Sequence, residues 1–155
     1  MSNEKGRLQQ EIYPEEKRLS QRFAIPGATV SYKKKRLIFR KNDFDEEFCP
    51  LINLSRGGMR FASREKLKTG TKLFTQLSIP GERSTLTLSG EVRWVSTGTS
   101  QAFPYQLGVQ FNPYGKNKGQ NYPGNLVKII ALENKFTEPD QARPEASDEY
   151  QIEDS

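Results

Sequence analysis

The chain has 155 residues, of which 34% are hydrophobic and 28% charged, a size and polarity that suit one small domain with loose ends. It has no histidine and a single cysteine, Cys49, which excludes a histidine-based catalytic triad, an internal disulfide and a multi-cysteine zinc site. The net charge of +5 divides into −6 over residues 133–155 and +11 over the rest. This asymmetry indicates an anionic ligand or surface for the basic part, unless the basic face is merely solvated.

The two ends of the chain differ in composition from the middle. Residues 1–16 are polar and have no hydrophobic period, so we expect a flexible arm. Residues 137–155 are acidic and poor in apolar groups, which predicts a disordered tail. The sequence has neither an apolar stretch of signal-peptide length at its start nor eighteen consecutive apolar residues, so we expect a cytoplasmic protein whose folded domain spans residues 17–136.

From Phe23 onward, short runs of alternating polar and apolar residues are separated by turn residues, a pattern typical of small β-barrels and sandwiches. The third run, which contains Cys49, is apolar, and the cysteine is expected to be a buried thiol. The predicted strands are residues 28–32, 36–41, 48–54, 59–62, 72–79, 85–96 and 106–111.

Period-two alternation assigns side chains to the two faces of these strands. In the last three strands it predicts an inward face made of Leu73, Thr75, Leu77 and Ile79, then Leu86, Leu88, Gly90, Val92 and Trp94, then Leu107, Val109 and Phe111. Gly90 is a candidate for a bulge or bend.

One amphipathic helix is predicted near the end of the chain. Residues 125–136 place Leu126, Ile129, Ile130 and Phe136 at helical spacing, so the helix can cover an open end or seam of the barrel. The predicted fold class is therefore all-β, a small antiparallel barrel with one short C-terminal helix.

Two arginines lie four residues apart just before the first strand, at Arg18 and Arg22. A guanidinium group can bind guanine O6 and N7 or two phosphate oxygens with a pair of parallel hydrogen bonds, and it can also stack on a base. Because these arginines lie between the arm and the first strand, they can fold over a ligand that rests on the barrel.

A second motif, Asn53-Leu54-Ser55-Arg56-Gly57-Gly58, runs from a strand into a glycine turn. If Ile52 and Leu54 face the core, Asn53 and Ser55 point outward together and form a polar surface. The two glycines allow close approach of a planar group and positive φ. Asparagine and serine together offer the donors and acceptors needed to bind the edge of a purine.

Each motif alone is a common turn or solvated-surface pattern, but both occur here in order, before an all-β pattern. Together, RxxxR at Arg18 and Arg22 and NxSxxG at Asn53, Ser55 and Gly58 resemble the signature of PilZ domains. The stretches Gly90-Glu91-Val92-Arg93-Trp94-Val95 and Leu107-Gly108-Val109-Gln110-Phe111 resemble later strands of that six-stranded barrel.

The resemblance implies a receptor for the bacterial second messenger cyclic di-GMP. By analogy, Arg18 and Arg22 contact phosphate and guanine, Asn53 and Ser55 hydrogen-bond the guanine or phosphate, and the two glycines keep the turn open. Lys17 stands where an arginine often precedes the motif, which leaves open whether one ligand molecule or a stacked pair binds.

The expected mechanism is ordering of the arm by the ligand, which creates a surface for a downstream protein partner. Two other functions remain open: an adaptor of this fold that does not use the ligand, and a small barrel that binds single-stranded nucleic acid through Lys33-Lys34-Lys35-Arg36. An enzyme is the least expected class, because no recognisable catalytic pairing or phosphate-binding glycine loop is present. No cofactor or metal is expected.

Overall fold

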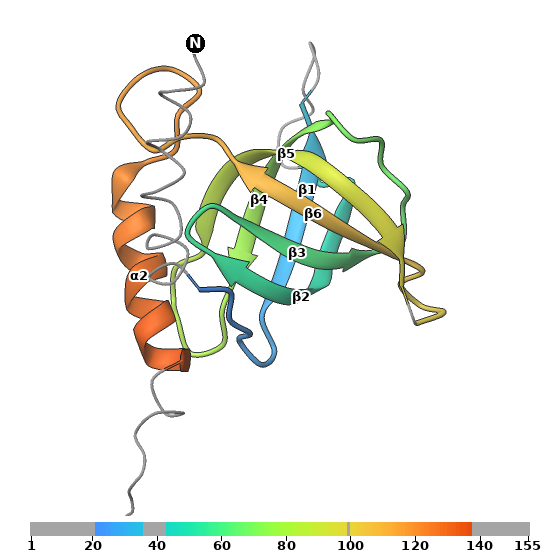
Figure 1. Cartoon of the computed structure of the whole chain (residues 1–155), viewed down its shortest axis with the longest axis horizontal. Helices are drawn as coiled ribbons and strands as arrows, with labels where there is room; N and C mark the ends of the chain where they lie inside the picture. The colour runs from blue at the N-terminus through green and yellow to red at the C-terminus, as the bar shows by residue number, and fades with distance from the viewer. Residues whose placement is uncertain (1–20, 36–42, 99, 138–155) are drawn as a thin grey trace, which may run out of the picture.

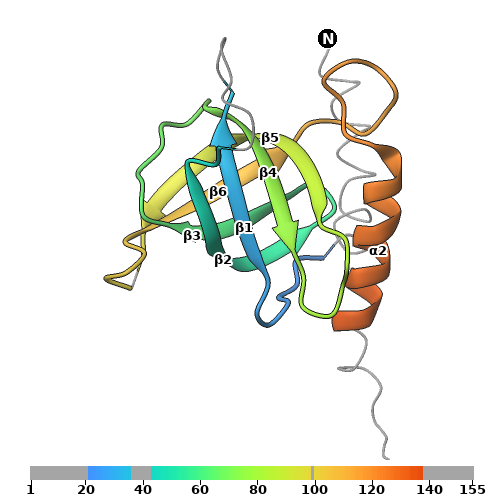
Figure 2. The ribbon, with the colours of Figure 1, turned by 180° about the vertical axis from the view of Figure 1, so that it is seen from behind.

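Six antiparallel strands close into a barrel in the order β1-β2-β3-β6-β5-β4, with β4 pairing back to β1 (Figure 1). The structure is a computed structural model that describes residues 21–35, 43–98 and 100–137. Its elements are β1 Thr29–Lys34, β2 Glu46–Ser55, β3 Gly58–Ser63, β4 Lys72–Ser78, β5 Leu86–Thr97, β6 Tyr105–Phe111 and α2 Pro123–Thr137. Figure 2 shows the far side of the barrel, where β1 lies between β2 and β4.

The structure confirms the predicted all-β barrel with a C-terminal helix. Six of the seven predicted strands correspond to β1–β6 with small shifts at their ends, and the predicted strand at 36–41 lies outside the described residues. The helix begins two residues earlier than predicted, at Pro123, and it includes Thr137, which the sequence had assigned to the tail. The predicted arm at 1–16 and the tail from residue 138 also lie outside the described residues.

Alternation is regular in β4 and β6 and places their apolar side chains in the core. In β4 and just beyond it, Leu73, Thr75, Leu77 and Ile79 are all less than 10% exposed, as are Leu107, Val109 and Phe111 of β6. Thr75 is the polar member of this set, and its hydroxyl donates a hydrogen bond to the Leu88 carbonyl at 2.7 Å. The predicted inward faces of these two strands are confirmed.

Irregular pairing in β2 and β5 changes which side chains face inward. The register shifts between Leu51 and Asn53 in β2, and Leu51, rather than the predicted Ile52, packs against the core. It shifts again between Val92 and Trp94 in β5, two residues beyond the bulge predicted near Gly90. Because an extra residue reverses the alternation that follows it, the assignment of Trp94 to the inward face was wrong.

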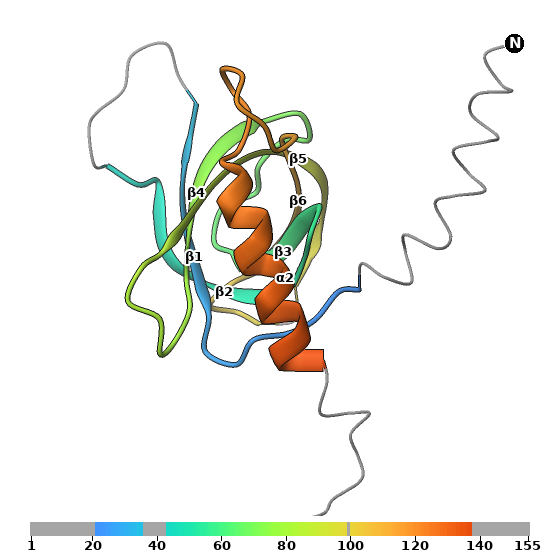
Figure 3. The same ribbon diagram turned by 90° about the vertical axis from the view of Figure 1, so that its left-hand side faces the viewer.

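Helix α2 packs against the barrel through Ile129 and Leu132, which belong to the same hydrophobic core as the strands. Figure 3 shows the helix lying across one end of the barrel. Burial of these two side chains joins the helix to the barrel as one folded unit. Among the described residues, no helix is long and apolar enough to cross a membrane.

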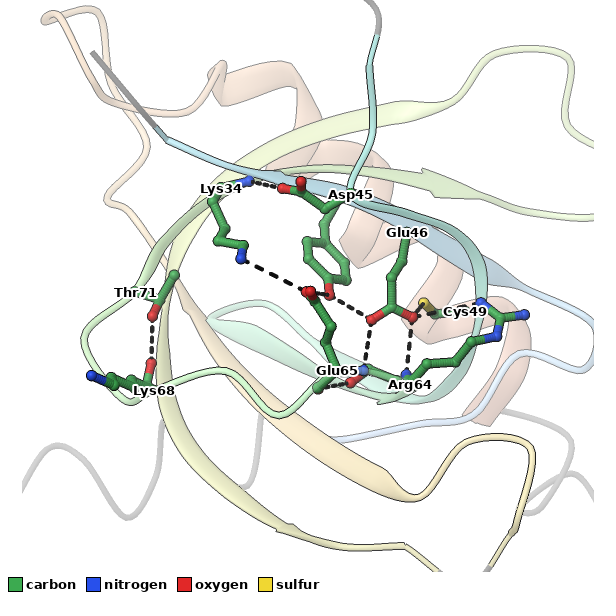
Figure 4. A network of polar contacts seen from close by, with 10 residues as sticks. Lys34, Asp45, Glu46, Cys49, Arg64, Glu65, Lys68 and Thr71 are labelled. Atoms are coloured by element: carbon green, nitrogen blue, oxygen red, sulfur yellow. Dashed lines mark hydrogen bonds and ion pairs between the residues drawn. The ribbon is translucent and has the colours of Figure 1, made fainter. Parts of the chain in front are cut away.

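Glu46, at the start of β2, is a buried carboxylate surrounded by donors (Figure 4). Its oxygens accept hydrogen bonds from the backbone N–H groups of Arg64 and Glu65, each at 2.9 Å. The Tyr32 hydroxyl donates to the same carboxylate at 2.6 Å, and the Cys49 thiol donates at 3.4 Å. Four donors therefore compensate the loss of hydration that this carboxylate suffers on burial.

We predict that Glu46→Ala lowers the free energy of unfolding by on the order of 3 kcal/mol, because it leaves the backbone N–H groups of Arg64 and Glu65 without their acceptor. The Tyr32 hydroxyl keeps its longer hydrogen bond to Glu65 Oε1, at 3.1 Å. Urea unfolding monitored by circular dichroism measures this loss. The matched control is Glu47→Ala at the exposed neighbouring position, which should change stability by less than about 0.5 kcal/mol. Equal stability of the two variants would contradict the role given to Glu46.

We also predict that Cys49 is unreactive in the folded protein. Burial raises the pKa of the Cys49 thiol, and the negative charge of the neighbouring Glu46 raises it further. The thiol therefore stays protonated at pH 8. Because this is the only cysteine, an aromatic disulfide reagent should titrate one thiol in urea and react far more slowly without urea. Rapid reaction of one equivalent in native buffer would show that the thiol is accessible.

Candidate functional site

The two sequence motifs are joined by a short antiparallel bridge outside the six strands. The backbone N–H of Phe23 donates to the Leu54 carbonyl at 2.9 Å, and the N–H of Leu54 donates to the Phe23 carbonyl at 2.8 Å. Leu54 is fully buried and Phe23 nearly so, which fixes the bridge to the core. Because neighbouring side chains alternate across a strand, Arg22 is held beside the outward side of the second motif.

Arg22 reaches the second motif directly. Its Nη1 donates a hydrogen bond to Asn53 Oδ1 at 3.3 Å on the exposed surface. Ser55 is half-buried, and its hydroxyl donates to the Gly58 carbonyl at 3.3 Å. The structure thus brings together Arg22, Asn53 and Ser55, whereas Arg18 lies outside the described residues.

Close packing requires glycine at position 58 but not at position 57. Neither Gly57 nor Gly58 has a positive φ, contrary to the conformation that the sequence suggested. A Cβ atom at Gly58 would lie 2.3 Å from the Val109 carbonyl oxygen, so only glycine permits this approach of β3 to β6. A Cβ atom at Gly57 would meet nothing within 4 Å, and the surface above the turn is therefore open.

An open pocket of about 360 Å³ lies beside this turn. Four of the six predicted site residues line it, while Asn53 is connected to it through the hydrogen bond from Arg22. The complete lining is Arg22, Ser55, Gly57, Gly58, Met59, Arg93, Trp94, Gly108, Val109 and Gln110. The volume is at the lower end of the range for ligand pockets, roughly 300–1,000 Å³.

Trp94 is the most informative lining residue that the sequence interpretation missed. The bulge in β5 directs it to the outer surface, where its indole lies against Gly108 of β6. A Cβ atom at Gly108 would be 2.2 Å from the indole Nε1, so the glycine makes room for the ring. An outward glycine in a central strand is the signal that could have revealed a covering aromatic side chain.

Arg60 of β3 extends the outer surface next to Trp94. Its guanidinium carbon lies 4.5 Å from the centre of the indole ring, a distance suited to a cation–π interaction. In register, Asn53 pairs with Arg60, Arg60 with Gly108, and Gly108 with Trp94, so the row crosses four strands. Within the described part of the chain, Arg60 Nε is buried and has no hydrogen-bond partner.

The side chains around the pocket offer charge, hydrogen-bonding groups and an aromatic surface. Arg22 and Arg93 supply positive charge, Trp94 supplies an aromatic surface, and Ser55 supplies a donor and an acceptor. No group of three or more metal-ligating side chains occurs among the residues that the structure describes. The arrangement matches an anionic ligand that contains a planar ring.

Comparisons with solved structures identify relatives of the fold. No protein of curated function has a significantly similar sequence. The structure resembles the PilZ domain of YcgR from Escherichia coli solved with c-di-GMP, with a TM-score of 0.51 and 15% identity over 80% of this chain and 97% of that one. It also resembles the Bacillus subtilis inhibitor of motility MotI/DgrA, with a TM-score of 0.50 and 12% identity over 73% of this chain.

The present chain spans about half of the MotI chain, 47%. Both structural matches have low identity and establish the fold. The sequence itself matches the model of the PilZ domain over residues 16–121, a range that contains both motifs and all six strands. The chain therefore belongs to the PilZ domain family.

Proposed function

We propose that the chain is a cyclic di-GMP receptor whose ligand rests on the outer surface of β2 and β3 beside the pocket. The observation that carries this proposal is the bridge between Phe23 and Leu54, which holds Arg22 within hydrogen-bonding distance of Asn53. The YcgR domain with a similar fold was solved with c-di-GMP, which supports the same ligand class here.

The ligand offers two phosphates and two guanines, and the site offers partners for both kinds of group. Arg22 can exchange its hydrogen bond to Asn53 for charge-assisted bonds to phosphate or to the guanine O6 and N7 edge. This exchange frees the Asn53 amide for the base. Trp94, half-buried at the pocket wall, offers a ring on which a base can stack.

The proposed mechanism is rearrangement of the segment that carries Arg18 and Arg22. Phe23 is fixed to the core and the backbone of Gln21 is held by Glu133, so the change falls on the Arg22 side chain and on the residues before Gln21, which close over the ligand. The rearranged segment then presents a new surface to a downstream protein in the cytoplasm. Binding energy comes from contacts made only in the closed arrangement, and catalysis is not required.

We predict that Arg22→Ala and Arg18→Ala each weaken binding of cyclic di-GMP about ten- to a hundredfold, since loss of one charged hydrogen-bonding contact is worth roughly 1.5–3 kcal/mol. Isothermal titration calorimetry measures the affinity and also whether one or two ligand molecules bind. The control is Arg83→Ala, at an exposed turn residue that does not line the pocket, which should bind like the wild type. Unchanged affinity in both test variants would refute the assigned site.

We also predict that Trp94 reports binding by fluorescence. It is the only tryptophan in the chain and lines the pocket, so a stacked or nearby guanine should change its emission in a saturable manner. GTP at the same concentration is the control for nonspecific quenching by guanine. An emission spectrum that does not respond to saturating cyclic di-GMP, in a protein that calorimetry shows to be liganded, would place the ligand away from Trp94.

A further inference from the structure

A buried carboxylate on α2 contacts both ligand motifs at once. Glu133 is only 5% exposed, and its Oε1 accepts a hydrogen bond from Arg56 Nε at 3.0 Å, which is also an ion pair. Its Oε2 accepts a longer hydrogen bond, 3.4 Å, from the backbone N–H of Gln21. One side chain of the C-terminal helix is thus connected to two segments that are distant in the sequence.

The two partners of Glu133 lie inside the two motifs. Gln21 directly precedes Arg22 in the arginine motif, and Arg56 lies between Ser55 and Gly57 in the glycine turn. Arg56 does not line the pocket, and its guanidinium group contacts the helix instead. Figures 1 and 3 show α2 beside the turn that joins β2 to β3.

A second contact from the C-terminal part of the chain holds the same turn. The Tyr114 hydroxyl, in the segment between β6 and α2, donates a hydrogen bond to the Arg56 carbonyl at 2.7 Å. Burial raises the pKa of Tyr114 to about 12, so the hydroxyl remains a donor throughout the physiological pH range. The backbone and the side chain of Arg56 are therefore both held by residues that follow the barrel.

The contacts of Glu133 are not needed to attach the helix, because Ile129 and Leu132 already pack α2 against the core. Burial of the Glu133 carboxylate carries a desolvation penalty that an apolar side chain would not incur. The penalty is offset only while Arg56 and Gln21 keep the positions seen here. The docking of α2 and the positions of the two motifs are thus energetically linked.

We propose that Glu133 is a positioning residue that couples α2 to the ligand site. The proposal rests on the proposed function: a ligand held by Arg22 and Ser55 fixes the backbone on both sides of Glu133 and thereby tightens the docking of α2. Coupling is reciprocal, so weakening the contacts of Glu133 must also weaken ligand binding. Helix α2 would then report occupancy of the pocket to a partner without any change in the barrel.

The test is Glu133→Gln, which keeps the size of the side chain but removes the charge and one of the two acceptor oxygens. We expect the affinity for cyclic di-GMP to fall by roughly fivefold or more, within the range typical of coupling between sites. The matched control is Asn134→Ala, at the exposed neighbouring position on the same helix, which should bind like the wild type. Arg56→Gln removes the ion pair from the more exposed partner, and it provides the test if E133Q fails to fold.

Hydrogen exchange provides a readout that loss of packing alone would not produce. In the wild type, cyclic di-GMP should slow exchange of the α2 amides, and this protection should be lost in E133Q and R56Q. The double variant, E133Q with R56Q, should have the same affinity for cyclic di-GMP as whichever single variant has the lower affinity, because both changes break the same contact.

The two proposals fail in different ways. If the folded wild-type protein does not bind cyclic di-GMP, the proposed function is overturned. If the wild type binds and R22A does not, normal affinity in E133Q and R56Q would overturn the coupling alone. Weaker binding without ligand-dependent protection of α2 would overturn it as well.

Discussion

The pairing of Phe23 with Leu54 is the constraint on which the site depends. Two backbone hydrogen bonds, at 2.9 and 2.8 Å, connect the segment before the barrel to the strand that carries the second motif. Both side chains are buried, so the bridge cannot shift by one residue without exposing one of them to water. This register fixes Arg22 at the surface next to Asn53 and Ser55, where a charge and a polar pair can act on one ligand.

The parts of the fold that were predictable follow strict alternation. The faces of β4 and β6 were assigned correctly because a buried residue every second position leaves one arrangement for each strand. A bulge in β5 was predicted at Gly90, but its exact position, and the irregular pairing in β2, were not predictable, because a bulge depends on the partner strand as well as on the local sequence. The misplacement of Ile52 and Trp94 follows directly from these two shifts.

The part of the site that could be predicted consists of residues that lie close together in the sequence. Asn53 and Ser55 share one face by alternation, and glycines after them indicate a turn, so short sequence patterns were sufficient. The positive φ suggested for Gly58 was wrong, and the close approach of the Val109 carbonyl, which the sequence did not reveal, is what requires glycine there. The contacts of Glu133 cross 77 and 112 residues, and no local pattern contains such information.

The two buried carboxylates differ in what their burial achieves. Glu46, at the start of β2, takes its donors from β1, from β2 and from the residues that follow β3, all within the barrel, so its burial stabilises the barrel itself. Glu133 takes its donors from two separate segments, and its burial is favourable only while both are in place. A closed barrel resists deformation because every strand is paired on both sides. In the proposed coupling, ligand binding would therefore act through side chains outside the sheet, and the contacts between the glycine turn and α2 supply that connection.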